Sequence, residues 1–95
     1  MAILHIEHRI KDLEVWLEAF RKFTPAREQA GVHATHVWQP ADDPHYVVVH
    51  LEFESVSAAG KFRTFLRENV WSSPDASPGL DGSPTALVFN EVVVD

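Results

Sequence analysis

Residues 2–10 alternate between two sets of side chains, a period that is typical of a β-strand. The mainly apolar set consists of Leu4, Ile6, His8 and Ile10. The mainly polar set consists of Ile3, His5, Glu7 and Arg9. Residues 46–53 repeat this alternation with a run of valines, and the shorter β-branched segment 32–39 precedes them across a turn with two prolines. Residues 85–94 have the same character. We therefore predict four strands, of which the middle two form a hairpin.

Two segments between these strands show apolar residues at helical spacing. The first begins after Asp12, a typical N-cap residue. Pro25 interrupts this segment, so that either the helix kinks there or a new turn begins at Thr24, and Gly31 ends the pattern. The second helix is predicted after Ser55 or Ser57. The apolar stripes of the two segments consist of Leu13, Trp16, Leu17, Phe20 and Phe23, and of Ala59, Phe62, Leu66 and Val70.

The order of the elements is therefore β-α-β-β-α-β, that of the ferredoxin-like α+β fold. Right-handed crossovers place both helices on one face of a four-stranded antiparallel sheet with strand order 4-1-3-2. A half-apolar open face of this size is more than a monomer normally exposes, so we predict a homodimer that closes it into an α+β barrel. The residues predicted on this face are Tyr46, Val48, His50 and Glu52 from the third strand, and Val88, Asn90 and Val92 from the last.

Length and composition narrow the classes of function. The 95 residues suffice for one domain, which we assign to residues 1–95. With a net charge of −6 and no run of Lys or Arg, the chain lacks the basic surface that binding to nucleic acid or to an anionic membrane requires. The polar start does not fit a signal peptide and no apolar run is long enough to span a bilayer, so we expect a cytoplasmic protein. The absence of cysteine excludes thiolate zinc sites, iron–sulfur clusters and Cys nucleophiles.

Several segments together resemble small bacterial proteins with a dimeric α+β barrel, the broad group that includes antibiotic biosynthesis monooxygenases and polyketide cyclases. The resemblance covers nearly the whole chain, although residues 69–77 depart from the regular helical continuation of that group. It implies a dimer that binds a small aromatic or polyketide-like substrate, either in a cleft between helices and sheet or inside the barrel. The segments are His8–Asp12 with Trp16 and Phe20, then Gly31, Val37-Trp38, Ala41–Pro44, Glu52-Phe53, Ala58-Ala59 with Phe62, and Gly79–Pro84.

Six histidines, at positions 5, 8, 33, 36, 45 and 50, are the most prominent chemical feature. A cofactor-free oxygenase or cyclase needs a general base, a donor that stabilises a developing oxyanion, and an apolar cleft. We predict His36 and His50 as catalytic bases because each lies in the middle of a strand, and we expect His8 only to form a hydrogen bond near the first helix. The predicted substrate-binding residues are His5, Trp16, Trp38, Tyr46, Phe62 and Asn90.

Neither His5-x-x-His8 nor His33-x-x-His36 can chelate a metal by itself, because residues three apart on a strand point to opposite faces. We expect no metal and no other cofactor. The predicted function is a cofactor-independent monooxygenase or cyclase that acts on an aromatic or polyketide-like substrate. Two alternatives stay open, a non-catalytic dimeric barrel that binds a small apolar or aromatic molecule and a haem-binding relative. The side of the sheet on which His36 lies is also undetermined, because a one-residue slip in the hairpin reverses it.

Overall fold

The computed structural model describes the whole chain, residues 1–95. It contains four strands and three helices, and the predicted order of elements is confirmed, with the first helical segment divided in two. None of the helices has the length and apolar character needed to cross a membrane. In chain order the elements are β1 (Ala2–Ile10), α1 (Leu13–Lys22), α2 (Thr24–Gln29), β2 (Ala34–Trp38), β3 (Tyr46–Phe53), α3 (Val56–Asn69) and β4 (Leu80–Asn90).

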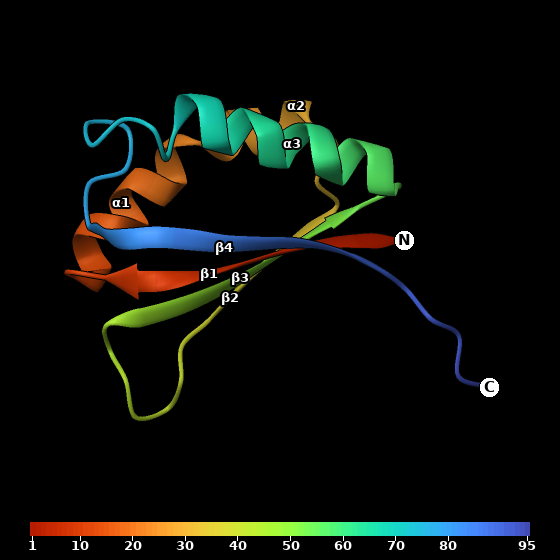
Figure 1. Ribbon diagram of the computed structural model, residues 1–95, viewed down its shortest axis with the longest axis horizontal. Helices are drawn as coiled ribbons and strands as arrows, with labels where there is room; N and C mark the ends of the chain where they lie inside the picture. Colours follow the sequence, from red (N-terminus) through yellow and green to blue (C-terminus); the bar gives the residue numbers. More distant parts are fainter.

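The strands form one antiparallel sheet in the order β2-β3-β1-β4, as predicted. All three helices lie on the same face of this sheet, and no element of the chain covers the other face (Figure 1). This is the ferredoxin-like α+β arrangement. It leaves the chain with two distinct surfaces for function, the layer between helices and sheet and the open face.

The core fills the layer between the helices and the two central strands, β1 and β3. Alternate residues of β3 point into it, and Val47, Val49, Leu51 and Phe53 are at most 1% exposed. From α3, Phe62 contacts the ring of Phe53 with 5.8 Å between the centroids. Burying a side chain of this size stabilises the fold by about 1.5–3 kcal/mol. The predicted alternation of both central strands is confirmed.

The helices begin where their capping residues predict. The side chains of Asp12 and Ser55 each accept a hydrogen bond from a backbone N–H in the first turn of α1 and α3. α1 ends at Lys22 and α2 begins at Thr24 with Pro25 in its first turn, so the interruption is a new helix rather than a kink. Gly31 has a φ of 86°, a left-handed conformation that glycine adopts without strain.

β4 begins earlier than the predicted residue 85. Leu80 and Asp81 already pair with Ile10 and Arg9 at the end of β1, and the register shifts between Glu7 and Arg9. The glycines and prolines of this segment predicted a loop. Backbone pairing with the end of β1 overrides that local preference.

The last strand also faces the other way from the prediction. Val88 pairs with the buried residue Leu4, and Asn90 pairs with Ala2, so both lie on the helix side of the sheet. Leu87 and Phe89 lie on the open face instead. Val92 lies beyond the end of the strand, so the prediction for all three residues was wrong. Apolar residues occupy both sets of alternate positions in β4, and the pattern alone therefore does not determine which set faces the helices.

Candidate functional site

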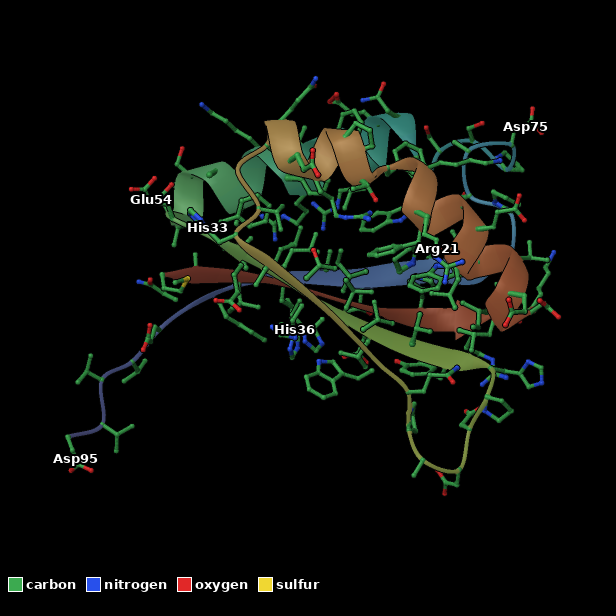
Figure 2. The ribbon with its side chains drawn as sticks, turned by 180° about the vertical axis from the view of Figure 1, so that it is seen from behind. Arg21, His33, His36, Glu54, Asp75 and Asp95 are labelled. Carbon is green, nitrogen blue, oxygen red and sulfur yellow. The ribbon has the colours of Figure 1, made fainter.

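The structure divides the residues predicted for the site between the two sides of the sheet. Figure 2 shows His36 on the side away from the helices. The paired positions place His5, His36 and His50 in one row across β1, β3 and β2, and Trp38 lies on the same face. Only two of the predicted residues, Trp16 and Phe62, lie between the helices and the sheet. Asn90 is also on the helix side of the sheet, but it is exposed at the end of β4 rather than packed under the helices.

A cavity of about 70 Å³ lies between the helices and the sheet, next to the buried face of β1 and β3. Its polar side chains are His8, Arg27 and Ser77. The remaining lining residues include five aromatic side chains from α1, α3 and the residues that follow these helices: Trp16, Phe20, Phe23, Phe62 and Trp71. We call this space the helix-side cavity. A mainly apolar cavity with a few polar groups is the usual form of a small-molecule site.

His8 is the one imidazole that faces the helix-side cavity, and it is 6% exposed. Its Nδ1 lies 2.9 Å from the carbonyl oxygen of Arg9. A carbonyl only accepts, so Nδ1 carries the proton, and in the neutral ring Nε2 keeps its lone pair. Nε2 has no hydrogen-bond partner in the chain. Every fully buried side-chain nitrogen or oxygen of the protein does have a partner, so Nε2 is not one of these buried atoms. Its lone pair is therefore available to a molecule in the cavity.

The surroundings of His8 keep it neutral. The ring meets the edge of Trp16 with 5.9 Å between the centroids, and no carboxylate forms an ion pair with it. Burial lowers the pKa of His8, and the hydrogen bond to Arg9 opposes this only in part. An unprotonated imidazole at neutral pH is the form that accepts a proton. The expected hydrogen bond of His8 is present, but no feature of the sequence predicted that burial would lower the pKa of its ring.

Arg27 is the second polar group of the cavity and is 8% exposed. Its guanidinium donates hydrogen bonds to the carbonyl oxygen of Phe20 at 2.8 Å and to Oγ1 of Thr24 at 3.0 Å. It also lies over the ring of Phe20, 3.9 Å from the centroid. Burial lowers its pKa from the ordinary value, without making it neutral at physiological pH. Arg27 was not among the residues predicted from the sequence, although its spacing from Phe20 and Phe23 places it on the apolar face.

The segment between α3 and β4 closes one side of the cavity. Trp71, Ala76, Ser77 and Pro78 line it from this segment. Gly79 has a φ of 88°, and a Cβ at this position would lie 3.2 Å from the backbone nitrogen of Trp16. The segment is therefore pressed against the start of α1. It is also the part in which the sequence departs from the regular pattern of the family it resembles.

The open face carries a continuous chain of hydrogen bonds. The hydroxyl of Tyr46 donates to Oε1 of Glu7 at 2.6 Å, and Oε2 of Glu7 lies 2.5 Å from Nε2 of His5. Nδ1 of His5 then lies 2.9 Å from Nε2 of His50. The bond from Tyr46 lowers the pKa of Glu7 and raises that of Tyr46 itself. The carboxylate of Glu7 accepts a hydrogen bond from Nε2 of His5 and so orients that ring.

The same face holds a second imidazole–carboxylate pair beside this chain. Nε2 of His36 lies 3.3 Å from Oε2 of Glu52, and the ring of Trp38 stacks on His36 with 5.9 Å between the centroids. Burial, and then the nearby His5 and His36, lower the pKa of His50. No three His, Asp or Glu side chains are arranged to hold a metal ion. The open face can move protons, but a single chain leaves it in contact with water.

No protein-family model and no curated protein sequence matches the chain. Its fold, in contrast, matches solved structures. One is an antibiotic biosynthesis monooxygenase, with a TM-score of 0.68, 15% identity, and 98% of this chain and 100% of that chain covered. Another is a monooxygenase from Streptomyces coelicolor in complex with the ligand nanaomycin D, with a TM-score of 0.62, 17% identity, and 99% and 89% covered.

A third match is a dimeric ferredoxin-like protein from an uncultured marine organism, with a TM-score of 0.61, 13% identity, and 97% and 96% covered. These similarities show that the chain has the fold of the antibiotic biosynthesis monooxygenase group, as the resemblance in sequence predicted. At these identities they show the fold alone, and a fold hosts many functions.

Proposed function

We propose that this protein is a cofactor-independent monooxygenase or cyclase that binds an aromatic or polyketide-like substrate in the helix-side cavity. The observation that carries the proposal is the position of His8. It is a buried, neutral imidazole with a free Nε2, in a cavity with aromatic walls. General-base catalysis needs a proton acceptor with a pKa near or below the working pH, and a site that excludes water.

In this proposal Nε2 of His8 takes a proton from an acidic C–H or O–H group of the substrate, and the electron pair is delocalised onto a substrate oxygen. In an oxygenation, the resulting carbanion reacts with O₂ at a CH₂ carbon. One oxygen atom becomes a carbonyl oxygen, and the other leaves as water with the two hydrogens of that carbon. In a cyclisation, the carbanion instead attacks a carbonyl carbon of the same molecule, and the alkoxide takes up the proton. Neither reaction requires an electron carrier.

His36 and His50, the bases predicted from the sequence, remain the competing assignment. The chain from Glu7 through His5 to His50 supports it, because a carboxylate orients one ring against the other. For these residues to work away from water, a second chain must cover the open face. The two assignments therefore predict different variants with lost activity.

The test is turnover of small anthrones, quinols and β-diketones by single His→Ala variants, followed by oxygen uptake and product formation. We expect His8→Ala to lower turnover by about 10²–10⁴-fold, the usual contribution of a general base. His45→Ala is the matched control, because His45 is exposed in the β2–β3 turn. Loss of activity in His36→Ala or His50→Ala, with His8→Ala active, would transfer the site to the open face.

A binding protein without catalysis is the second candidate function, and the predominantly apolar lining of the cavity favours it. It predicts that aromatic molecules bind while none of the substrates above is converted. Haem, like a multi-ring substrate, is larger than the space of about 70 Å³, and a wall of the helix-side cavity would have to move to admit it. Binding without turnover in the parent protein would select this candidate.

We also propose that two copies associate through the open face. Trp38, Leu87 and Phe89 leave large apolar side chains exposed there, at 54%, 46% and 45%. The dimeric ferredoxin-like protein of similar fold supports this assignment. Sedimentation at micromolar concentration is expected to give twice the mass of 10.7 kDa. A monomer at that concentration would contradict it.

A further inference from the structure

Arg27 is a buried cation without a buried counter-charge. It is 8% exposed, and no carboxylate lies within 4.0 Å of its guanidinium. The carboxylate whose charge raises the pKa of Arg27 is that of Glu28, the next residue along the chain. Taking a charge out of water without pairing it is unfavourable, so buried charges are normally paired. The helix-side cavity next to Arg27 has room for the missing partner.

The geometry leaves donors of Arg27 free for such a partner. A guanidinium has five N–H groups, and one bond from Nη1 and one from Nη2 are made within the chain. Nη1 and Nη2 each keep one further N–H, Nε has no partner and is not a buried atom, and the residue lines the cavity. Phe20 covers one face of the guanidinium at 3.9 Å, which restricts its orientation and leaves the in-plane donors accessible.

His8 adds a proton acceptor to the same cavity. When an acidic O–H group enters, its O–H bond breaks, the proton moves to Nε2 of His8, and the electron pair stays on the ligand oxygen. Arg27 lines the same cavity and can donate hydrogen bonds to an anionic oxygen of the ligand. Charge-assisted bonds of this kind to a guanidinium are stronger than bonds between neutral groups. A ligand that is already a carboxylate needs only Arg27.

We infer that the helix-side cavity takes aromatic ligands that carry an acidic oxygen, a carboxylate, phenolate or enolate, and that Arg27 binds this oxygen while the aromatic walls hold the ring. The inference rests on the proposed use of the cavity and narrows its substrate class. It makes Arg27 a specificity-determining residue. If Arg27 served only to join α1 to α2 through its hydrogen bonds, the charge of a ligand would not change its affinity.

The experiment compares benzoate with benzamide, which has nearly the same shape and no charge, by calorimetry on the whole chain. We expect the wild type to bind benzoate at least about tenfold more tightly, and Arg27→Gln to abolish this preference while benzamide binding stays unchanged. Arg27→Lys should keep part of the preference, because it keeps the charge. Arg21→Gln, an exposed residue of α1, is the matched control and should behave as wild type.

A phenol probe separates the two acidic classes and gives a spectroscopic readout. Bound 4-nitrophenol is expected to show more phenolate absorbance than the free probe at the same pH, and Arg27→Gln should remove the difference. A carboxylate-only site would bind benzoate without this change in the phenol. Either result supports an anionic oxygen at Arg27. A change in the phenol absorbance shows that the site accepts a phenolate, and benzoate binding without that change shows that it accepts a carboxylate only.

Three outcomes overturn the inference. Arg27→Gln could keep the preference for benzoate, or could weaken benzoate and benzamide equally, which would make Arg27 a structural residue only. If Arg27→Gln does not fold, a wild type and an Arg27→Lys variant that both bind benzamide as tightly as benzoate lead to the same conclusion. Failure of both aromatic probes and of 4-nitrophenol to bind the wild type would instead contradict the proposed use of the cavity itself.

Discussion

His8 and His50 lie on neighbouring strands, β1 and β3, and face opposite sides of the sheet. Burial is the largest cause that lowers the pKa of both rings. Their neighbours differ in kind, because His8 contacts the edge of Trp16 and one carbonyl, whereas His50 shares a hydrogen bond with His5. One side of the sheet isolates an imidazole from water. The other side connects imidazoles to one another and to carboxylates, where a second chain is needed to exclude solvent.

The largest expected difference between the two sides is in stability. Phe62→Ala removes a ring from the cavity wall and core, where it is 5% exposed, and should lower the free energy of unfolding by about 3–5 kcal/mol. Trp38→Ala removes a larger ring from the open face, where it is 54% exposed, and should change that free energy of a single chain by less than about 0.5 kcal/mol. Urea unfolding at a concentration that keeps the chains apart measures both. Equal losses would mean that the open face is part of the folded core.

The rim of the cavity provides the next contrast. Gly79→Ala combines a φ of 88° with a Cβ 3.2 Å from the backbone of Trp16, and should destabilise the protein by about 1–3 kcal/mol. Gly60→Ala is the control, because that helical position has nothing within 4 Å. It should stabilise the protein by about 0.4–1 kcal/mol. Thermal unfolding of the two variants should therefore shift in opposite directions, and a neutral Gly79→Ala would show that the rim is not held against α1.

Self-association tests the open face directly. Phe89→Ala removes a 45% exposed ring that lies 5.3 Å from His5 between centroids, and should weaken the association of two chains by at least about 1 kcal/mol, or about fivefold in the dissociation constant. Sedimentation equilibrium measures this change. Val15→Ala, also exposed but on α1, is the control and should leave association unchanged. An effect of Val15→Ala comparable to that of Phe89→Ala would place the contact on the helix side.

The smallest expected effect is on the pH dependence of stability. Both histidines have a lowered pKa in the folded protein, so below about pH 6.5 the unfolded chain binds more protons than the folded one. The contribution of these two histidines to the free energy of unfolding is therefore complete above about pH 6.5 and is lost as the pH falls below that value. His8→Gln should flatten this part of the profile more than His50→Gln does, because His8 is the more buried ring. Urea unfolding across this pH range tests the order, and a reversed order would contradict the comparison.

The sequence predicted the fold and the environment of the two central strands correctly, because each alternates one strongly apolar set with one polar set. In β4, Ala86 and Val88 alternate with Leu87 and Phe89, and both sets are apolar. Only the pairing with β1 determines which set faces the helices. The side of the sheet on which His36 lies could not be predicted because a one-residue slip in the hairpin reverses it, and its pairing with His50 determines that side.

The candidate site could be predicted only in part. Trp16 and Phe62 followed from helical spacing, and they do line the helix-side cavity. His8 lies on the apolar set of β1, which was visible in the sequence, but its water-excluded contact with α1 depends on how that helix packs. Arg27 and Trp71 come from segments that meet only in the folded chain. A charged residue on an apolar helical face is the signal that could have identified Arg27.

The small volume of the helix-side cavity governs how fast a ligand can bind. A space of about 70 Å³ does not admit a multi-ring molecule unless a wall moves first, and the segment from Trp71 to Gly79 is the wall that belongs to no helix or strand. Binding then requires an open form of the protein, and the observed affinity is reduced by the fraction of molecules that have opened. At high ligand concentration the association rate should reach a plateau set by that opening. The narrow space that limits the access of water thus also sets the pace of binding.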